Sequence, residues 1–210
     1  KNEATRIRSI GRLDKETSGI LLFARNQVAA ARLQKQREEG KLQKKYLALA
    51  EGDLSEANDS VFWKEIAIPL APDPENSMKM TISPDGLLPG SRNAVTYYKN
   101  IKNFGNATLV KLQLETGRTH QIRVHMAGIG HPLLGDTMYN PGTCLNMSNS
   151  KEKKNTKGRI NNRNDCFKRA ALHAWKLTFC HPFTDEIITL EAPLPDDFCR
   201  FLNANEEEKT

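Results

Sequence analysis

The sequence lacks the features of membrane-embedded and secreted proteins. Its longest apolar run, residues 19–24, has the length of a strand and falls far short of the roughly 20 residues that a membrane helix needs. The basic start, residues 1–8, is not followed by the apolar core of a signal peptide. The first residue is a lysine, so we expect that sequence upstream is missing.

Cysteine is also scarce. The four cysteines are widely spaced and form no CxxC pair: Cys144, Cys166, Cys180 and Cys199. In a chain of 210 residues this pattern is typical of reduced thiols in a cytosolic protein, not of a disulfide framework. We therefore expect a cytoplasmic protein with no membrane association.

The histidines do not form a metal motif. His120, His125 and His131 are spaced by five and six residues, unlike the two histidines of HExxH, and no acidic residue lies between the first two. We expect neither a metal nor a cofactor.

The composition is that of an ordinary globular protein, with 38% hydrophobic and 27% charged residues. The net charge of +6 suits a polyanionic partner. Charge alone does not establish this, because many basic proteins bind no nucleic acid.

The chain predicts many short strands and few helices, which indicates an α+β fold. Asn26 is suited to cap a helix over residues 27–39 that ends at Gly40. The polar stretch 140–168 is predicted to be an exposed, mobile insertion in one domain spanning residues 1–205. Strands are predicted over residues 20–24, 44–50, 94–99 and 107–114, and the last two of these are expected to form a hairpin. Further strands are predicted near residues 61–68 and 78–82, and over residues 171–180 and 186–191.

Two residues are candidates for chemistry, although each has an ordinary interpretation. Asp14 lies in a turn-rich loop beside Arg12, and spacing alone favours a turn or cap aspartate. Arg118 or Arg123 could hold its carboxylate ionised through paired hydrogen bonds. Tyr46 could fill a core or stack on a nucleobase, and taken alone the core is favoured.

Four segments, taken together, resemble one family. Arg12-Leu-Asp-Lys-Glu-Thr-Ser-Gly-Ile-Leu-Leu-Phe-Ala24 is similar to the RLDxxTSGLLLFA motif of RluA-type pseudouridine synthases, and Lys45-Tyr46 to the lysine/glutamine–tyrosine pair that follows it. Residues 117–123 and 131–136 resemble GRTHQIR and HPLLGD, and the C-terminal LHA, HP and APLP motifs follow in order. The resemblance covers about residues 6–202.

This resemblance implies a mixed, mostly antiparallel curved sheet with helices around it and a central RNA-binding cleft. It implies that Asp14 is the catalytic nucleophile, that Arg123 ion-pairs with it and that Tyr46 stacks on the target uracil. Arg12 would enter the RNA stack as the target leaves, and Leu172 would pack on the uracil. Substrate contacts are also expected from three residues of the GRTHQIR segment: Arg118, His120 and Gln121.

The expected reaction isomerises uridine to pseudouridine in rRNA or tRNA by a monomeric enzyme. Either covalent attack or abstraction of a ribose proton would need an ionised Asp14, and the sequence leaves both routes open. Two departures from the family pattern stand out: Gly11 replaces a common histidine, and the family's earlier NKPxGxxVH segment is absent. A catalytically inactive RNA-binding fragment or module on the same scaffold is therefore the alternative.

Overall fold

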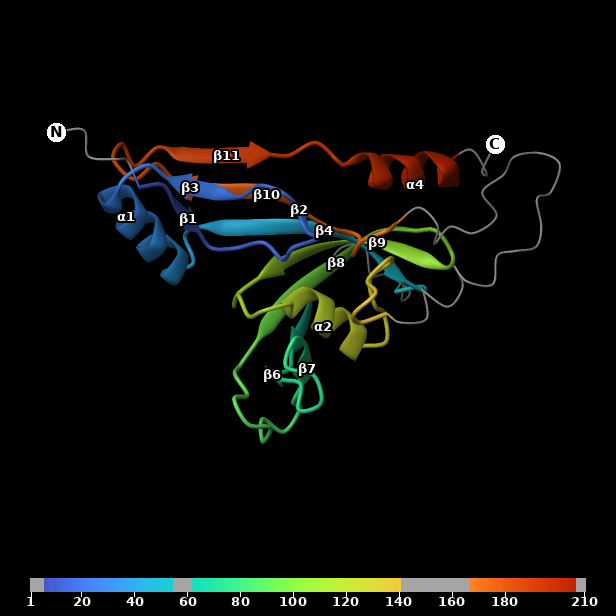
Figure 1. Cartoon of the computed structure of the whole chain (residues 1–210). Helices are drawn as coiled ribbons and strands as arrows, with labels where there is room; N and C mark the ends of the chain where they lie inside the picture. The colour runs from blue at the N-terminus through green and yellow to red at the C-terminus, as the bar shows by residue number, and fades with distance from the viewer. Residues whose placement is uncertain (1–5, 55–61, 141–166, 207–210) are drawn as a thin grey trace.

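The computed structural model describes residues 6–54, 62–140 and 167–206. Most of the predicted insertion, residues 141–166, lies outside the described residues. The centre of the molecule is a seven-stranded sheet in the order β11-β10-β4-β9-β8-β5, with β2 also paired to β10 (Figure 1). Its strands are β2 (Ser18–Gly19), β4 (Gln43–Glu51), β5 (Lys64–Ala67), β8 (Val95–Asn103), β9 (Ala107–Leu114), β10 (Leu172–Cys180) and β11 (Ile187–Glu191).

The sheet is antiparallel except at one edge. Strand β2 runs parallel to β10, with Ser18 opposite His173 and Gly19 opposite Ala174. All the other pairings in this sheet are antiparallel, including the β8–β9 hairpin that the sequence predicted. The predicted α+β class with a mixed, mostly antiparallel sheet is confirmed.

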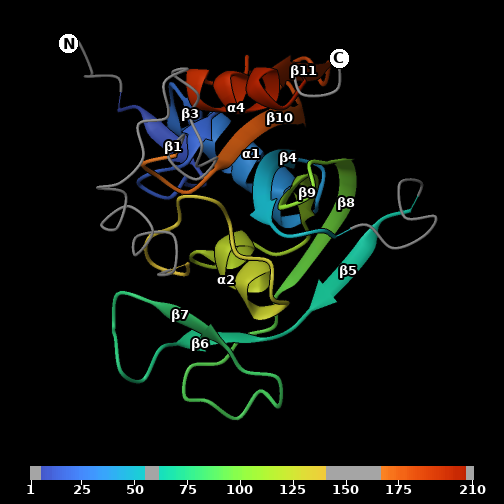
Figure 2. The same ribbon diagram turned by 90° about the vertical axis from the view of Figure 1, so that its right-hand side faces the viewer.

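The two faces of the sheet are buried by different helices. Ala48 and Leu112 face the core formed with α2 (Gln121–Gly128), whereas Leu49 and Leu109 face the core formed with α4 (Asp196–Glu206). Figures 1 and 2 show these two helices on opposite sides of the sheet. Because side chains alternate along a strand, neighbouring residues of β4 and β9 serve opposite faces.

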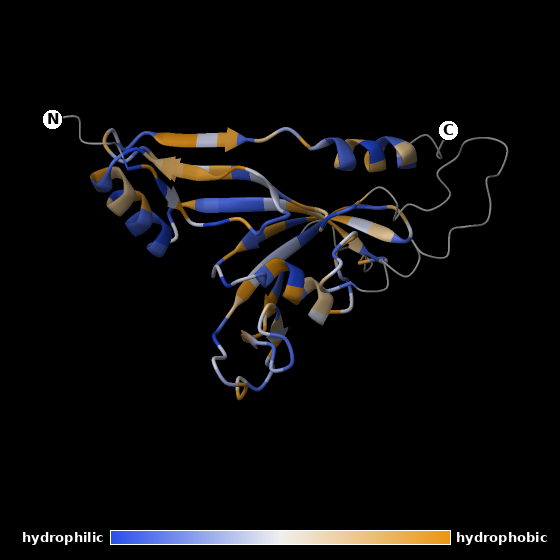
Figure 3. Cartoon of the chain, in the orientation of Figure 1, coloured by the Kyte–Doolittle hydropathy of each residue, from blue (hydrophilic) through white to orange (hydrophobic). Residues whose placement is uncertain are grey.

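Helix α1 (Gln27–Glu38) begins and ends where the sequence predicted. The Asn26 side chain accepts a hydrogen bond from the Ala29 amide at 2.8 Å, as an N-cap does, and Gly40 follows with φ +70°. Leu33 packs against β10 in a third hydrophobic cluster. The rest of the helix is largely hydrophilic (Figure 3), as expected for a helix that buries only one face.

The predicted strand over residues 20–24 is found only over residues 22–24, and a second short strand precedes it. Residues Ser18–Gly19 form β2, and β3 (Leu22–Ala24) instead pairs with β1 (Arg8–Ile10) in a separate ribbon. Gly19 explains the change of direction: it has φ +109°, and a Cβ there would lie 2.2 Å from the Ala174 carbonyl oxygen. Only glycine allows this approach.

Within the described residues, two helices, α2 and α4, were not predicted from the sequence. In α2, six consecutive residues from Gln121 to Met126 are buried, so the helix has no polar face to produce an amphipathic period. It packs over the small sheet of β6 (Leu70–Pro72) and β7 (Met80–Ile82), seen below it in Figure 2. No helix in the described part of the chain is long and apolar enough to cross a membrane.

Candidate active site

A cavity of about 350 Å³ collects most of the predicted site residues. Its walls come from the loop after β1, the end of α1, the start of β4, and the end of β9 with the following loop. The predicted residues that line it are Arg12, Asp14, Tyr46, Arg118, Gln121 and Leu172. His120 and Arg123 are not among the lining residues, although the Asp14 charge acts on both.

The loop that carries Asp14 is short and closed on itself. The Thr17 amide donates to the Asp14 carbonyl at 3.0 Å, and β2 then ties the end of the loop to β10. The Ser18 hydroxyl lies 2.9 Å from His173 Nδ1, and the Ile20 amide donates to Ala174 O at 2.9 Å. The loop is thus anchored at its C-terminal end to the central sheet.

Arg169 is a second anchor that the sequence did not indicate. Its Nη1 donates to the Glu16 carbonyl and to the Leu172 carbonyl, each at 3.1 Å. Its Nε and Nη2 bind the two carboxylate oxygens of Asp197, in the first turn of α4, at 2.8 and 3.0 Å. One guanidinium therefore connects the Asp14 loop, the cavity residue Leu172 and the C-terminal helix.

Tyr46 lines the same cavity as Asp14 and lies close enough to interact with its charge. Its side chain is buried within the α2 core, only 6% exposed. Burial and the nearby negative charge of Asp14 raise the pKa of Tyr46 to about 12. The phenol is consequently neutral over the physiological pH range and keeps its proton for donation.

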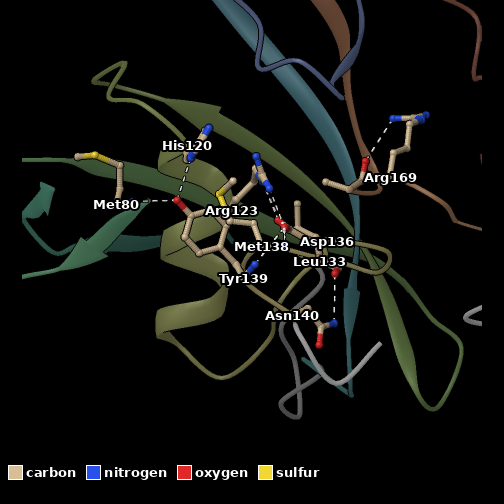
Figure 4. Close-up of polar contacts among 10 residues, drawn as sticks. Met80, His120, Arg123, Leu133, Asp136, Met138, Tyr139, Asn140 and Arg169 are labelled. Carbon is tan, nitrogen blue, oxygen red and sulfur yellow. Dashed lines mark hydrogen bonds and ion pairs between the residues drawn. The ribbon is translucent and has the colours of Figure 1, made fainter. Parts of the chain in front are cut away.

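Arg123 has a different partner from the one expected. Its Nε and Nη2 bind Oδ2 and Oδ1 of Asp136, both at 2.7 Å, in a buried bidentate ion pair (Figure 4). Among the described residues, the Asp14 carboxylate forms no ion pair within 4 Å and accepts no hydrogen bond. The direct Asp14–Arg123 pair predicted from the resemblance is therefore not present.

The physical reason is the burial of Asp136, which is fully inaccessible and must have a cationic partner. Burial alone would lower the pKa of Arg123, but the hydrogen bonds and charge of Asp136, with a smaller contribution from Asp14, raise it. Arg123 thus stays charged and acts on Asp14 through space. Its guanidinium also lies 5.0 Å from the centre of the Tyr139 ring.

His120 is held by Tyr139, as Figure 4 shows. The Tyr139 hydroxyl accepts from the Met80 amide at 2.9 Å and lies 2.8 Å from His120 Nδ1, so it donates its proton to that nitrogen. Burial lowers the pKa of His120, although Asp14 opposes this effect. If the His120 ring is neutral and carries its proton on Nε2, the Met80 amide, the Tyr139 hydroxyl and His120 Nδ1 each have a hydrogen-bond partner.

Gln121 uses its whole amide for protein contacts. Its Oε1 accepts from the Arg118 amide at 2.9 Å and from the Thr116 hydroxyl at 2.8 Å. Its Nε2 donates to Val95 O at 2.9 Å and to Thr96 Oγ1 at 3.0 Å. These contacts shape the loop that forms one wall of the cavity.

Positive charge predominates around the cavity. Burial and the neighbouring Arg37 lower the pKa of Lys44, which shows how closely the cations are placed. Within the described ranges, no group of three His, Cys, Asp or Glu side chains is arranged to hold a metal ion. The charged lining residues are Arg12, Arg37, Lys44 and Arg118, against Asp14 and Glu115.

A family model described as RNA pseudouridylate synthase matches residues 1–128, more than half of the chain. The chain belongs to this family. It is 38% identical over 197 residues to an uncharacterized RNA pseudouridine synthase of Bacillus subtilis, YhcT, covering 93% of this chain and 55% of that protein. It is 37% identical over 202 residues to the ribosomal large subunit pseudouridine synthase D of Haemophilus influenzae, covering 96% and 57%.

The solved structure of human RNA pseudouridylate synthase domain containing 4 is also similar. The TM-score is 0.70 at 26% identity, with coverage of 95% of this chain and 76% of that one. The chain spans about half the length of the curated relatives it matches.

Proposed function

We propose that this chain isomerises uridines in structured RNA to pseudouridine, with Asp14 as the nucleophile. The observation that carries the proposal is the Asp14 carboxylate, which lines a basic cavity beside the neutral hydroxyl of Tyr46. No described residue binds that carboxylate, so it is available to substrate. Ribosomal RNA is the first substrate to test, because several similar proteins are named for the large ribosomal subunit; tRNA is the second.

The reaction breaks the N1–C1′ bond, turns the uracil and forms a C5–C1′ bond. Asp14 either attacks C1′ or removes a ribose proton that is later returned, and in both routes it starts as an anion. Arg123 supplies a positive charge that interacts with Asp14 through space. In the last step C5 loses its proton and N1 of the uracil gains one from solvent, so the reaction has no net proton change. The neutral Tyr46 hydroxyl can relay the C5 proton by accepting it while donating its own to solvent, and the ring would stack on the uracil.

The other predicted residues divide into two groups. Arg12 and Arg118 line the cavity with cationic side chains, suited to RNA phosphates and to the gap left by the extruded nucleotide. Leu172 supplies an apolar wall. Gln121 and His120 act on substrate through the loop and helix start that they hold in place.

The test compares wild type with Asp14→Asn and Asp14→Ala on rRNA and tRNA transcripts, scoring pseudouridine directly. Both variants should lose conversion completely while RNA retention and unfolding stay near wild type. Asp85→Asn, in an exposed loop, is the matched control and should remain active. Turnover by folded Asp14→Ala would refute the nucleophile, and wild-type binding without turnover would favour the inactive RNA-binding module.

A further inference from the structure

The sheet carries a second basic surface on the side opposite Tyr46. Lys176, Lys45, Lys111 and Lys99 lie on the adjacent strands β10, β4, β9 and β8, together with Trp175; we name this set the lysine face. Lys176 is opposite Lys45, and Lys111 is opposite Lys99. Three inter-strand spacings make the row about 14 Å wide. Strand alternation places Lys45 on the opposite side of β4 from Tyr46.

The lysine face gathers like charge on four neighbouring strands. Burial lowers the pKa of Lys111, and the charges of Lys45, Lys176 and Lys99 lower it further, while Glu191 opposes them. Glu191 pairs with Lys176 at 2.7 Å. Like charges on neighbouring strands are destabilising, so an anionic ligand would relieve the repulsion.

Trp175 adds an aromatic surface to these charges. Its ring centre lies 4.8 Å from Lys111 Nζ and 5.7 Å from Lys176 Nζ, and the side chain is only partly buried. Cations beside an aromatic ring are the combination that binds nucleic-acid strands, since phosphates meet the cations and bases stack on the ring.

The lysine face is continuous with the candidate active site. Gln113 is opposite both Lys45 and Tyr97, so these three side chains share one side of the sheet. Gln43 lies two residues before Lys45 on the same strand and shares that side. Gln43, Gln113 and Tyr97 also line the cavity. The cavity therefore reaches around the ends of β4 and β9 to the border of the lysine row.

We propose that the lysine face binds the sugar-phosphate backbone of the same RNA, in the stretch that flanks the target nucleotide. The strand would leave the cavity over Gln43 and Gln113 and cross β4, β9 and β10. This inference rests on the proposed function for the identity of the ligand as RNA.

The experiment measures binding of two uridine-containing RNAs, one of about 8 nucleotides that is limited to the cavity and one of about 30 that can reach both surfaces. The variant is Lys111→Gln with Lys176→Gln. The matched control is Lys35→Gln with Lys41→Gln, two exposed lysines of the α1 region that pair with Glu39. Both double variants remove the same charge.

For the long RNA, loss of two phosphate contacts should lower the slope of log affinity against log salt by about 1.4, taking about 0.7 per contact on a single strand. Affinity should therefore fall about 25-fold at 0.1 M salt and only about threefold at 0.5 M. The affinity of the lysine variant for the short RNA, and the affinity of the control variant for both RNAs, should stay near the wild-type values. The fluorescence emission of Trp175, measured in a Trp63→Phe background, should change only when the long RNA binds.

Equal losses in the two double variants, or equal wild-type affinity for the two RNAs, would overturn the lysine face as a binding surface. Pseudouridine formation is scored separately in the same samples. An absence of turnover with the long-RNA effect intact would count against the proposed function and leave this inference standing.

Discussion

Arg123 and Asp136 form a buried bidentate ion pair, with both nitrogen–oxygen distances at 2.7 Å. Asp136 Oδ1 also accepts from the amides of Met138 and Tyr139 at 3.1 Å, so the pair organises the chain that follows α2. Arg123 is therefore a structural cation whose charge also reaches Asp14.

Asp136→Asn should destabilise the fold by about 3–5 kcal/mol, because it leaves the Arg123 charge buried without a counter-ion. Urea unfolding measures the loss. Asp73→Asn is the matched control: Asp73 also accepts from two backbone amides but is only half-buried and, among the described residues, has no buried cation as its partner, so its replacement should cost about 1 kcal/mol or less. Equal costs for the two variants would contradict the structural role of the pair.

Tyr46→Phe should lower kcat by about 100-fold, the range found for one lost proton-transfer group. Stability should change by about 1 kcal/mol, because the ring still fills its site. Since the pKa of Tyr46 is about 12, its ionisation cannot produce a fall in activity below about pH 11. A pH–rate profile checks both points, and unchanged kcat would leave Tyr46 with stacking alone.

Arg169→Lys should lower kcat by roughly 10- to 100-fold with little change in KM, because an ammonium cannot hold Asp197 and the Glu16 carbonyl together and the Asp14 loop would shift. Asp197→Asn should act in the same direction, and the double variant should be no worse than the more impaired single one. Arg200→Lys, on the exposed side of α4, is the control. Additive losses would mean that the two residues act independently.

As the pH falls, the free energy of unfolding should decrease at pH values where most carboxylates are still ionised. Burial lowers the pKa of His120, His125 and His173, so the unfolded chain takes up protons that the folded chain does not. The stability they contribute is complete above the unfolded value near 6.5 and declines as pH falls from there towards their folded values. Urea midpoints between about pH 7.5 and 5 measure this decline. His125→Gln should reduce the slope, and a flat profile in wild type would refute the expectation.

The strands and the first helix were predictable because their signals are local. Residues 107–114 combine alternation with a turn before them, and Asn26 and Gly40 mark the two ends of α1. Helix α2 gave no such signal, because Gln121–Met126 are buried all round. Burial on every side removes the polar face from which a surface helix is recognised.

In the candidate site, six of the eight residues named from the family resemblance line one cavity, but their contacts could not be predicted from the sequence. The resemblance gave Arg123 as the partner of Asp14, while the structure pairs it with Asp136. The role of Arg169 could not be predicted from the sequence, because it binds the Asp14 loop through backbone carbonyl groups, which every residue type carries. The one available sign was an arginine three residues before the LHA motif.

The parallel pairing of β2 with β10 has a consequence for biosynthesis. The Asp14 loop is translated well before the residues that hold it, which are Arg169, His173 and Asp197. A nascent chain that ends before β10 contains Asp14 without this support. The loop can therefore reach its final position only after β10 and α4 have been made.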